Sequence, residues 1–209
     1  MSRYFAWFGL PGSLVLTLLL SLFALCLAVL CGGADRWICF FAMILSSCGD
    51  IFLMNLDFIR SRFENYFVIG AVFFMVSHLV YAAAFLRLSR DHGYSTSGSG
   101  LVCSVIVSLI ALAVVLLLMV KNGTYTLSAL LLCVIYLGII TVNMACVFSF
   151  SFHAASDGHF WRLISAAGVL SFFISDCIIG LDILCGIGRF GHLIWWFYPI
   201  GQFLLLIAA

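Results

Sequence analysis

The chain has 209 residues, a formal net charge of +1, 66% apolar residues and only 8% charged residues. A soluble domain carries roughly a quarter charged residues. Here the deficit runs along the whole chain, which excludes a soluble enzyme with a single membrane anchor. The balanced charge leaves no basic stripe for a phosphate backbone, so we expect no nucleic-acid partner. The composition indicates an integral, multi-pass membrane protein.

Seven segments have about the 20 mostly apolar residues that a membrane-spanning helix needs. In chain order they lie at about 8–30, 38–56, 66–86, 101–120, 127–148, 163–183 and 193–208. The connections between them are short and hold nearly all the charge, which leaves no room for an extramembrane domain. We predict an all-α fold, a polytopic membrane helix bundle that forms one transmembrane domain over residues 1–209.

Few ionisable residues lie inside the predicted spans. Such a group near a helix centre costs about 2.5–3.5 kcal/mol on insertion scales, so the ones that are retained are candidates for function. Asp50 and Asp176 lie well inside the second and sixth spans, and Asp182 lies near the end of the sixth. His78 is the only histidine well within a span.

The depths of these residues can be compared, because spans two and six run in the same direction. At 1.5 Å per residue, Asp50 and Asp176 both lie roughly 10 Å inside the same membrane face. Spans three and seven start from that face, so Tyr198, Gln202 and His78 are expected about 8, 14 and 18 Å deep. We expect these side chains to line one polar pocket.

Helical periodicity adds three neighbours to this set. Tyr81 shares a face of the third span with His78, and Ser46 is an i,i+4 neighbour of Asp50. Gly49, beside Asp50, would let another helix or a lipid chain approach closely. These residues are candidates for supporting the two aspartates.

Other kinds of site fit the sequence less well. There is no His-Glu-x-x-His motif and His78 has no partner at ligand spacing, so no metal site is expected. The only lysine, Lys121, lies at a helix end, which excludes a Schiff-base chromophore within the spans. Without a Gly-x-Ser-x-Gly elbow, the serines are interpreted as packing and helix-bonding residues. Asn143 is assigned to interhelical hydrogen bonding, and the nine cysteines are interpreted as small buried apolar residues.

Four motifs follow one another between about residues 46 and 205. They are Ser-x-x-Gly-Asp-x-x-Leu at 46–53, Gly-x3-Phe-x3-His-x2-Tyr at 70–81, Gly-x-x-x-Phe-x-x-Ser-Asp at 168–176 and Tyr-x-x-x-Gln at 198–202. In this order they resemble the lysoplasmalogenase, or YhhN-like, family of small membrane proteins. That family usually has eight spans and a Lys-Pro pair ahead of the second, whereas here seven spans are predicted and no lysine precedes the early Pro11.

The resemblance implies hydrolysis of the vinyl ether bond of lysoplasmalogens, which releases a fatty aldehyde and glycerophosphoethanolamine or glycerophosphocholine. Asp50 and Asp176 would share the roles of catalytic acid and base, in either order, by analogy with the two carboxylates of glycosidases, which handle a similar oxocarbenium ion. The resemblance implies as substrate-binding or supporting residues Ser46, Gly49, His78, Tyr81, Ser175, Asp182, Tyr198 and Gln202. No metal or organic cofactor is required, and the partner is a membrane lipid within the bilayer.

Two other functions remain open at this stage. A membrane transporter or lipid-binding protein could use the Asp and His set as a proton or solute relay, and inverted repeats with broken helices would favour it. An intramembrane aspartyl protease would also use two membrane aspartates. It predicts Tyr-Asp and Gly-x-Gly-Asp motifs on neighbouring helices, and Cys48-Gly49-Asp50 supplies only the Gly-Asp.

Overall fold

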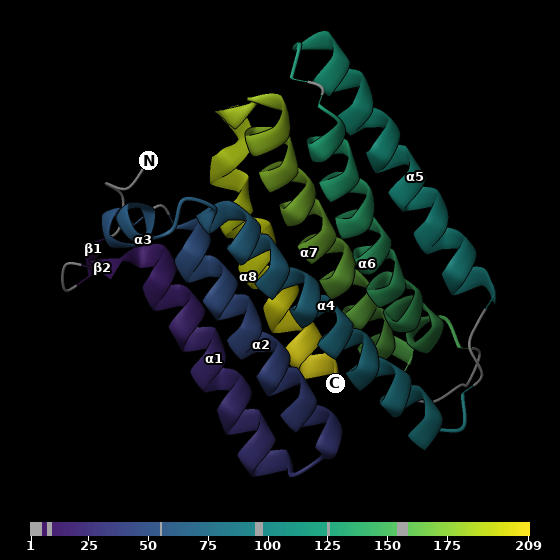
Figure 1. Ribbon diagram of the computed structural model, residues 1–209. Coiled ribbons are helices and arrows are strands. Elements are labelled where there is room, and N and C mark those ends of the chain that lie inside the picture. The colour runs from purple at the N-terminus through teal and green to yellow at the C-terminus, as the bar shows by residue number, and fades with distance from the viewer. Residues whose placement is uncertain (1–5, 8–9, 55, 95–97, 125, 154–158) are drawn as a thin grey trace.

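The computed structural model describes residues 6–7, 10–54, 56–94, 98–124, 126–153 and 159–209, and nearly all of them are helical (Figure 1). The long helices are α1 (Gly12–Cys31), α2 (Ala34–Leu53), α4 (Tyr66–Asp91), α5 (Gly98–Lys121), α6 (Leu127–Ser151), α7 (His159–Cys185) and α8 (Gly191–Ala208). Shorter elements are α3 (Asp57–Arg62), the 3-10 helix η1 (Gly188–Phe190) and the two-residue strands β1 (Ala6–Trp7) and β2 (Leu10–Pro11). Within these residues, seven helices are long and apolar enough to cross a membrane. The predicted all-α bundle is confirmed.

Several helix boundaries differ from the prediction; for example, α4 extends to Asp91 rather than 86, and α7 begins at His159 rather than 163. The first long helix begins at Gly12 rather than near residue 8, and residues 8–9 lie outside the described part of the chain. The second begins at Ala34, four residues earlier than predicted, because Gly32 adopts a positive φ of 70° that turns the chain within two residues. The predicted connection from 57 to 65 contains the helix α3.

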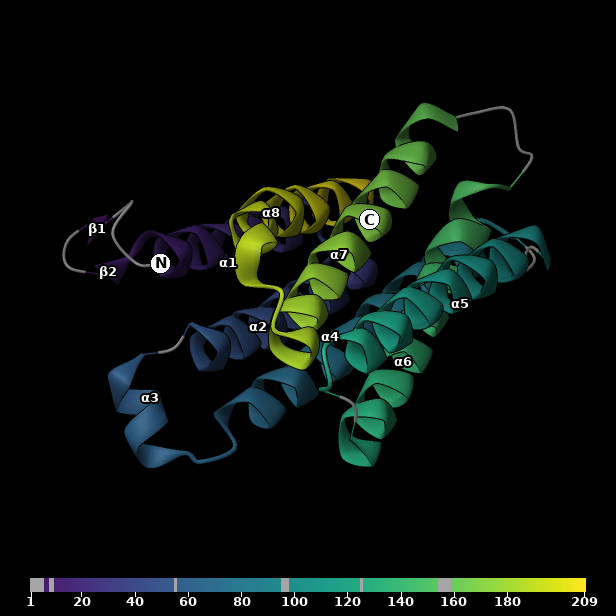
Figure 2. The same ribbon diagram turned by 90° about the horizontal axis from the view of Figure 1, so that it is seen from above.

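The outermost helices, α1 and α5, lie at opposite edges of the bundle (Figures 1 and 2). Large apolar side chains of α5, such as Ile110 and Leu117, point outward and are 60% and 71% exposed. An apolar outer surface is stable against hydrocarbon and unstable against water, so it faces lipid. Helices α4 and α7 are the most buried of the bundle and form its centre.

Two pairs of helices pack through glycine. Gly49 of α2 meets Gly70 of α4, and a Cβ atom at either position would lie 3.2 Å from the carbonyl oxygen of the other. Gly168 of α7 meets Gly201 of α8 in the same manner. Small residues let backbones approach closely, which maximises van der Waals contact between helices in lipid. The α2–α4 and α7–α8 pairs are therefore the tightly packed units, and the candidate site lies between them.

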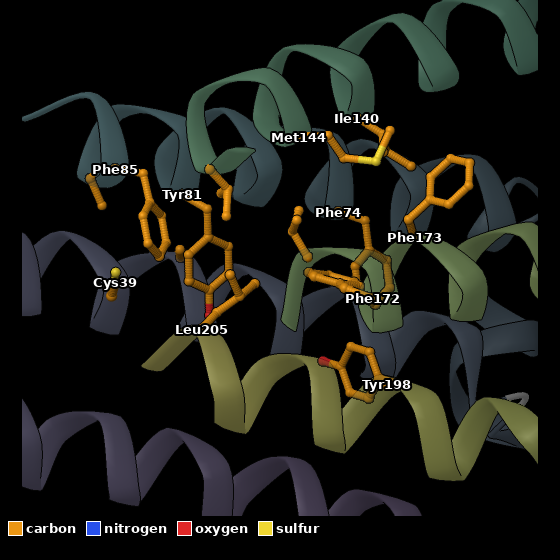
Figure 3. Packing of buried hydrophobic residues seen from close by; sticks show 14 of the residues in the cluster. Cys39, Phe74, Tyr81, Phe85, Ile140, Met144, Phe172, Phe173, Tyr198 and Leu205 are labelled. Carbon is orange, nitrogen blue, oxygen red and sulfur yellow. The ribbon is translucent and has the colours of Figure 1, made fainter. Parts of the chain in front are cut away.

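An aromatic cluster fills the space between these two pairs. Figure 3 shows Phe74, Phe172 and Tyr198 gathered between α4, α7 and α8. Their ring centroids are 5.5–6.3 Å apart in edge-to-face arrangements, the geometry that aromatic quadrupoles prefer. All three side chains are buried.

The interpretation of the cysteines was wrong for three of the nine. Cys26, Cys31 and Cys103 are exposed on the outer surface, whereas the other six are buried or partly buried. Lipid tails are as apolar as the protein interior, so a small apolar residue is tolerated on either side of the boundary.

Replacement of Gly201 by alanine should destabilise the protein. Its Cβ would lie 2.6 Å from the backbone nitrogen of Phe172, an atom that moves only with the whole helix α7. We expect a loss of about 1–3 kcal/mol from overpacking, measured as a lower melting temperature in detergent. The matched control is Gly138→Ala on α6, where a Cβ meets nothing within 4 Å. A Gly201→Ala protein as stable as the control would contradict the close crossing of α7 and α8.

Candidate active site

The Asp50 carboxylate lies near the end of α2 and takes its hydrogen bonds from two other helices. Its Oδ2 accepts from the Thr17 hydroxyl of α1 at 2.5 Å and from the Tyr198 hydroxyl of α8 at 2.6 Å. The Thr17 hydroxyl also lies 3.1 Å from that of Ser47, which lies 2.6 Å from that of Ser21. Asp50 is only 7% exposed. A buried carboxylate is thus held entirely by hydroxyl groups.

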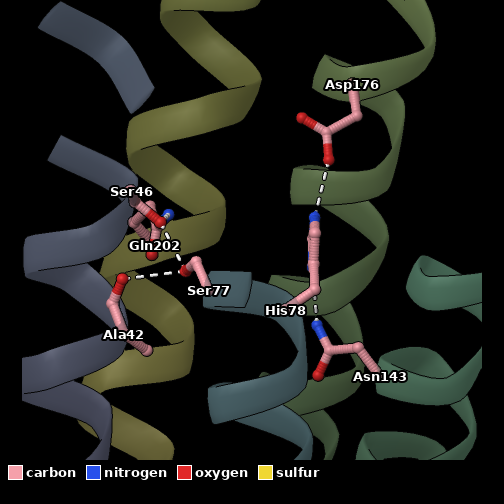
Figure 4. A network of polar contacts seen from close by, with 7 residues as sticks. All are labelled: Ala42, Ser46, Ser77, His78, Asn143, Asp176 and Gln202. Atoms are coloured by element: carbon pink, nitrogen blue, oxygen red, sulfur yellow. Dashed lines mark hydrogen bonds and ion pairs between the residues drawn. The ribbon is translucent and has the colours of Figure 1, made fainter. Parts of the chain in front are cut away.

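Asp176 of α7 has a different partner, the imidazole of His78 on α4 (Figure 4). Its Oδ2 lies 2.9 Å from Nε2 of His78, while Nδ1 of His78 lies 3.0 Å from the amide nitrogen of Asn143 on α6. An amide nitrogen only donates, so Nδ1 is the acceptor and Nε2 carries the proton that is donated to Asp176. All three side chains are buried. The row Asn143–His78–Asp176 therefore places the shared proton of the imidazole on Nε2.

One oxygen of Asp176 has no well-formed hydrogen bond. Among the described residues, its buried Oδ1 meets no donor at hydrogen-bond geometry, while the Tyr136 hydroxyl interacts with the same carboxyl group. A buried polar atom that is left unpaired costs about 1–3 kcal/mol. Such an atom calls for an explanation, and a site for a ligand or a reacting group is one of the recognised explanations.

A third polar network holds Ser46, Tyr81 and Gln202. Tyr81 donates to Oε1 of Gln202 at 2.6 Å, and the amide nitrogen of Gln202 donates to Ser46 at 3.0 Å. Ser46 lies 2.7 Å from the Ser77 hydroxyl, which donates to the carbonyl of Ala42. Figure 4 shows this group apart from the Asp176 row. Its groups satisfy one another across α2, α4 and α8, so it fastens α8 to the other two helices.

Phe172 stands between the two carboxylate systems. Its ring centroid lies 4.5 Å from that of His78, the partner of Asp176, and 5.5 Å from that of Tyr198, the partner of Asp50. No hydrogen bond joins Asp50 to Asp176 in the part of the chain that the structure describes. The ring of Phe172 therefore separates the partner of one carboxylate from the partner of the other.

Each carboxylate lines its own cavity. The Asp176 cavity, between α4, α6 and α7, is lined by apolar residues such as Phe74, Leu137 and Ile140, together with Tyr136. The Asp50 cavity, between α2, α7 and α8, is lined also by Asp182, Trp195 and Tyr198. Leu53 and Ile179 line both cavities, so the two adjoin.

The predicted site residues therefore fall into several groups. Asp50 and Tyr198 meet, Asp176 and His78 meet, and Ser46, Tyr81 and Gln202 form the separate network. Asp182 lines the Asp50 cavity, and Ser175 is buried. Gly49 receives helix α4 rather than a lipid chain. The predicted single pocket is wrong in this respect, because packing turns the shared face of α4 toward three different helices.

Three residues that contact or adjoin the carboxylates were not predicted as site residues. Thr17, on α1, donates directly to Asp50, and the available signal was the spacing by four of Ser13, Thr17 and Ser21 in a helix whose remaining side chains are apolar. Asn143 makes the predicted interhelical hydrogen bond, yet its partner is the site histidine. Tyr136 lines the Asp176 cavity, and nothing in the sequence distinguishes it from other aromatic residues.

Replacement of Asn143 by leucine should disturb the tautomer of His78. The change removes the donor to Nδ1, and a buried acceptor left unpaired costs about 1–3 kcal/mol. Nitrogen-15 NMR should show a single Nε2–H form in the wild type and a shifted equilibrium in Asn143→Leu. His78→Gln identifies the resonance, and Asn65→Leu, at an exposed position without a side-chain cap, is the control. A wild-type histidine protonated at Nδ1 would contradict the assignment.

Comparison with known proteins adds one finding. Residues 13–209 match the YhhN family, a range that includes both carboxylates, the three hydrogen-bonding networks and both cavities. No curated protein and no solved structure matches the chain. Because the match extends over almost the whole chain, the resemblance that the four motifs indicate is confirmed, and the chain belongs to the YhhN family.

Proposed function

We propose that this protein is a lysoplasmalogenase, a hydrolase that cleaves the vinyl ether bond of lysoplasmalogens to a fatty aldehyde and glycerophosphoethanolamine or glycerophosphocholine. The YhhN family is the family of lysoplasmalogenases, which supports the class of reaction. The observation that carries the proposal is the pair of buried carboxylates, Asp50 and Asp176, in adjoining cavities.

Vinyl ether hydrolysis needs what such a pair supplies. Protonation of the alkene carbon farther from the ether oxygen gives an oxocarbenium ion, which water attacks to form a hemiacetal that collapses to aldehyde and alcohol. The reaction needs an acid that delivers a proton to carbon, a base for water and negative charge near the cation. Two carboxyl groups in different surroundings separate the roles of acid and base, as in glycosidases.

The position of the site suits a lipid with one chain. The Asp50 cavity lies where α2 and α7 end and α8 begins, so it is close to one end of the bundle. A headgroup at that membrane face leaves the vinyl ether beside the carboxylates and the hydrocarbon among apolar helices. Asp182 and Trp195, in the wall of this cavity, are placed beside the headgroup end.

The test is aldehyde release by the purified protein in detergent from a lysoplasmalogen and from its saturated alkyl ether analogue. We expect release from the vinyl ether only. Asp50→Asn and Asp176→Asn should each lose about 100-fold or more in kcat, the usual contribution of a general acid or base. The matched control is Asp91→Asn, which changes an exposed aspartate at the end of α4.

The outcomes separate the candidate functions. Folded wild-type protein that releases no aldehyde from any lysolipid would refute the hydrolase and leave the carboxylates as a relay. Full activity in either folded site variant would remove that aspartate from the mechanism. Loss of activity in Asp91→Asn would show that the assay reports general stability.

A further inference from the structure

We propose that the Asp176 cavity binds the vinyl ether end of the substrate's hydrocarbon chain, which makes Asp176 the acid that protonates carbon and Asp50 the base that activates water. The assignment rests on the proposed function and deepens it. It places Asp176 on the hydrocarbon side of the ether oxygen, where it meets the alkene carbon, and Asp50 on the headgroup side, where it meets water.

The lining of the Asp176 cavity supports a hydrocarbon ligand. Apart from Asp176, Tyr136 and two cysteines, its walls are aliphatic and aromatic side chains from α2 and from α4 to α7. Its volume of about 70 Å³ is several times the roughly 10–15 Å³ that a cavity needs on the same measure to hold one water molecule. That space takes the few atoms of the reactive end of a chain.

The free oxygen of Asp176 is placed for proton transfer. Oδ2 accepts the Nε2 proton of His78, whereas Oδ1 is buried and makes no hydrogen bond among the described residues. Tyr136, in the wall of the same cavity, also interacts with this carboxyl group, but no well-formed hydrogen bond holds Oδ1, so a proton there can move to an alkene carbon in the cavity. The same hydrogen bond from His78 stabilises the carboxylate that remains after the transfer.

Asp50 has the surroundings of a base. Its Oδ2 accepts two hydrogen bonds from hydroxyl groups, and hydrogen bonds to a carboxylate stabilise its ionised form. Its cavity is the larger, at about 150 Å³, and it contains Asp182 and Trp195 as well. The Asp50 cavity thus has room for the water and the glyceryl end of the substrate.

The resulting reaction is balanced without any other reactant. The Oδ1 proton of Asp176 forms a bond to the alkene carbon, and the ether oxygen shares its lone pair with the adjacent carbon. Water adds to that carbon and gives one proton to Asp50, which forms the hemiacetal. The hemiacetal hydroxyl then returns a proton to Asp176, the carbon–oxygen bond breaks, and Asp50 protonates the glyceryl oxygen. Both carboxyl groups end as they began.

The first test fills the cavity. Gly180 lines the Asp176 cavity, and a Cβ there meets nothing within 4 Å, so Gly180→Leu adds volume without a backbone clash. We expect kcat/KM for aldehyde release to fall about tenfold or more, because a small misplacement of the reacting atoms is costly. The control Gly138→Leu adds the same side chain on α6 at an exposed position. Equal activity in the two variants, both folded, would overturn the proposal.

A second test does not depend on turnover. A saturated alkyl ether lysolipid with a diazirine on the chain carbon next to the ether should label α6 and α7 residues of the Asp176 cavity, and Gly180→Leu should abolish the labelling. If the probe instead labels residues around Asp182 and Trp195 while aldehyde release is normal, this inference is refuted and the proposed hydrolase function still stands. If the probe labels the Asp176 cavity of a protein that releases no aldehyde, the hydrolase function is refuted, and the cavity remains a binding site for the hydrocarbon chain.

The acid and the base are distinguished by azide. Azide needs no base to attack an oxocarbenium ion, so Asp50→Asn protein should form an azide adduct of the substrate, detected by mass spectrometry. Asp176→Asn protein should form none, because it does not generate the cation. The reverse pattern would overturn the assignment of the two roles.

Discussion

The structure depends on one constraint, that a polar group buried in a bundle surrounded by hydrocarbon must find its partners within the chain. Asp50 on α2 satisfies this constraint by accepting hydrogen bonds from hydroxyl groups on α1 and α8. Asp176 on α7 meets it through His78 on α4, which is held in turn from α6. The two carboxylates therefore connect six of the seven long helices, and the same hydrogen bonds that organise the site also hold the bundle together.

Close packing at glycine residues limits which polar side chains fit between the paired helices. The α2–α4 and α7–α8 pairs are close at Gly49 with Gly70 and at Gly168 with Gly201, and the polar contacts described inside each pair come from serines, Ser46 with Ser77 in the first and Ser171 with the carbonyl of Phe197 in the second. The two carboxylates make their hydrogen bonds to helices outside their own pair or across the pairs, on either side of Phe172. Tyr198 of one pair and His78 of the other are positioned to donate to the two carboxylates, and donors positioned before reaction are what electrostatic stabilisation of a charged intermediate needs.

The sequence was sufficient for the order of the long helices, but not for their exact ends or for their rotation about their axes. Asp50 lies three residues before the end of α2 and Asp176 nine before the end of α7, where equal depths were expected. The predicted depths correctly placed Tyr198 at the level of Asp50, because the position of a residue along a helix follows from counting residues. His78 and Tyr81 share a face of α4, yet one contacts α7 and α6 while the other contacts α8. Those contacts depend on interhelical packing, which no single helix encodes. The contact of Thr17 with Asp50 also depends on how two helices pack, so the sequence did not predict it.

The different surroundings of the two carboxylates bear on the kind of chemistry that they support. Aspartic proteases use two carboxyl groups in direct contact that share one proton. Here Asp50 is held by hydroxyl groups, Asp176 by an imidazole, and Phe172 stands between the two systems. No hydrogen bond joins these two carboxyl groups among the described residues, so no proton is shared directly between them. That separation favours a reaction in which one group gives a proton to carbon while the other takes a proton from water, with the substrate lying between them.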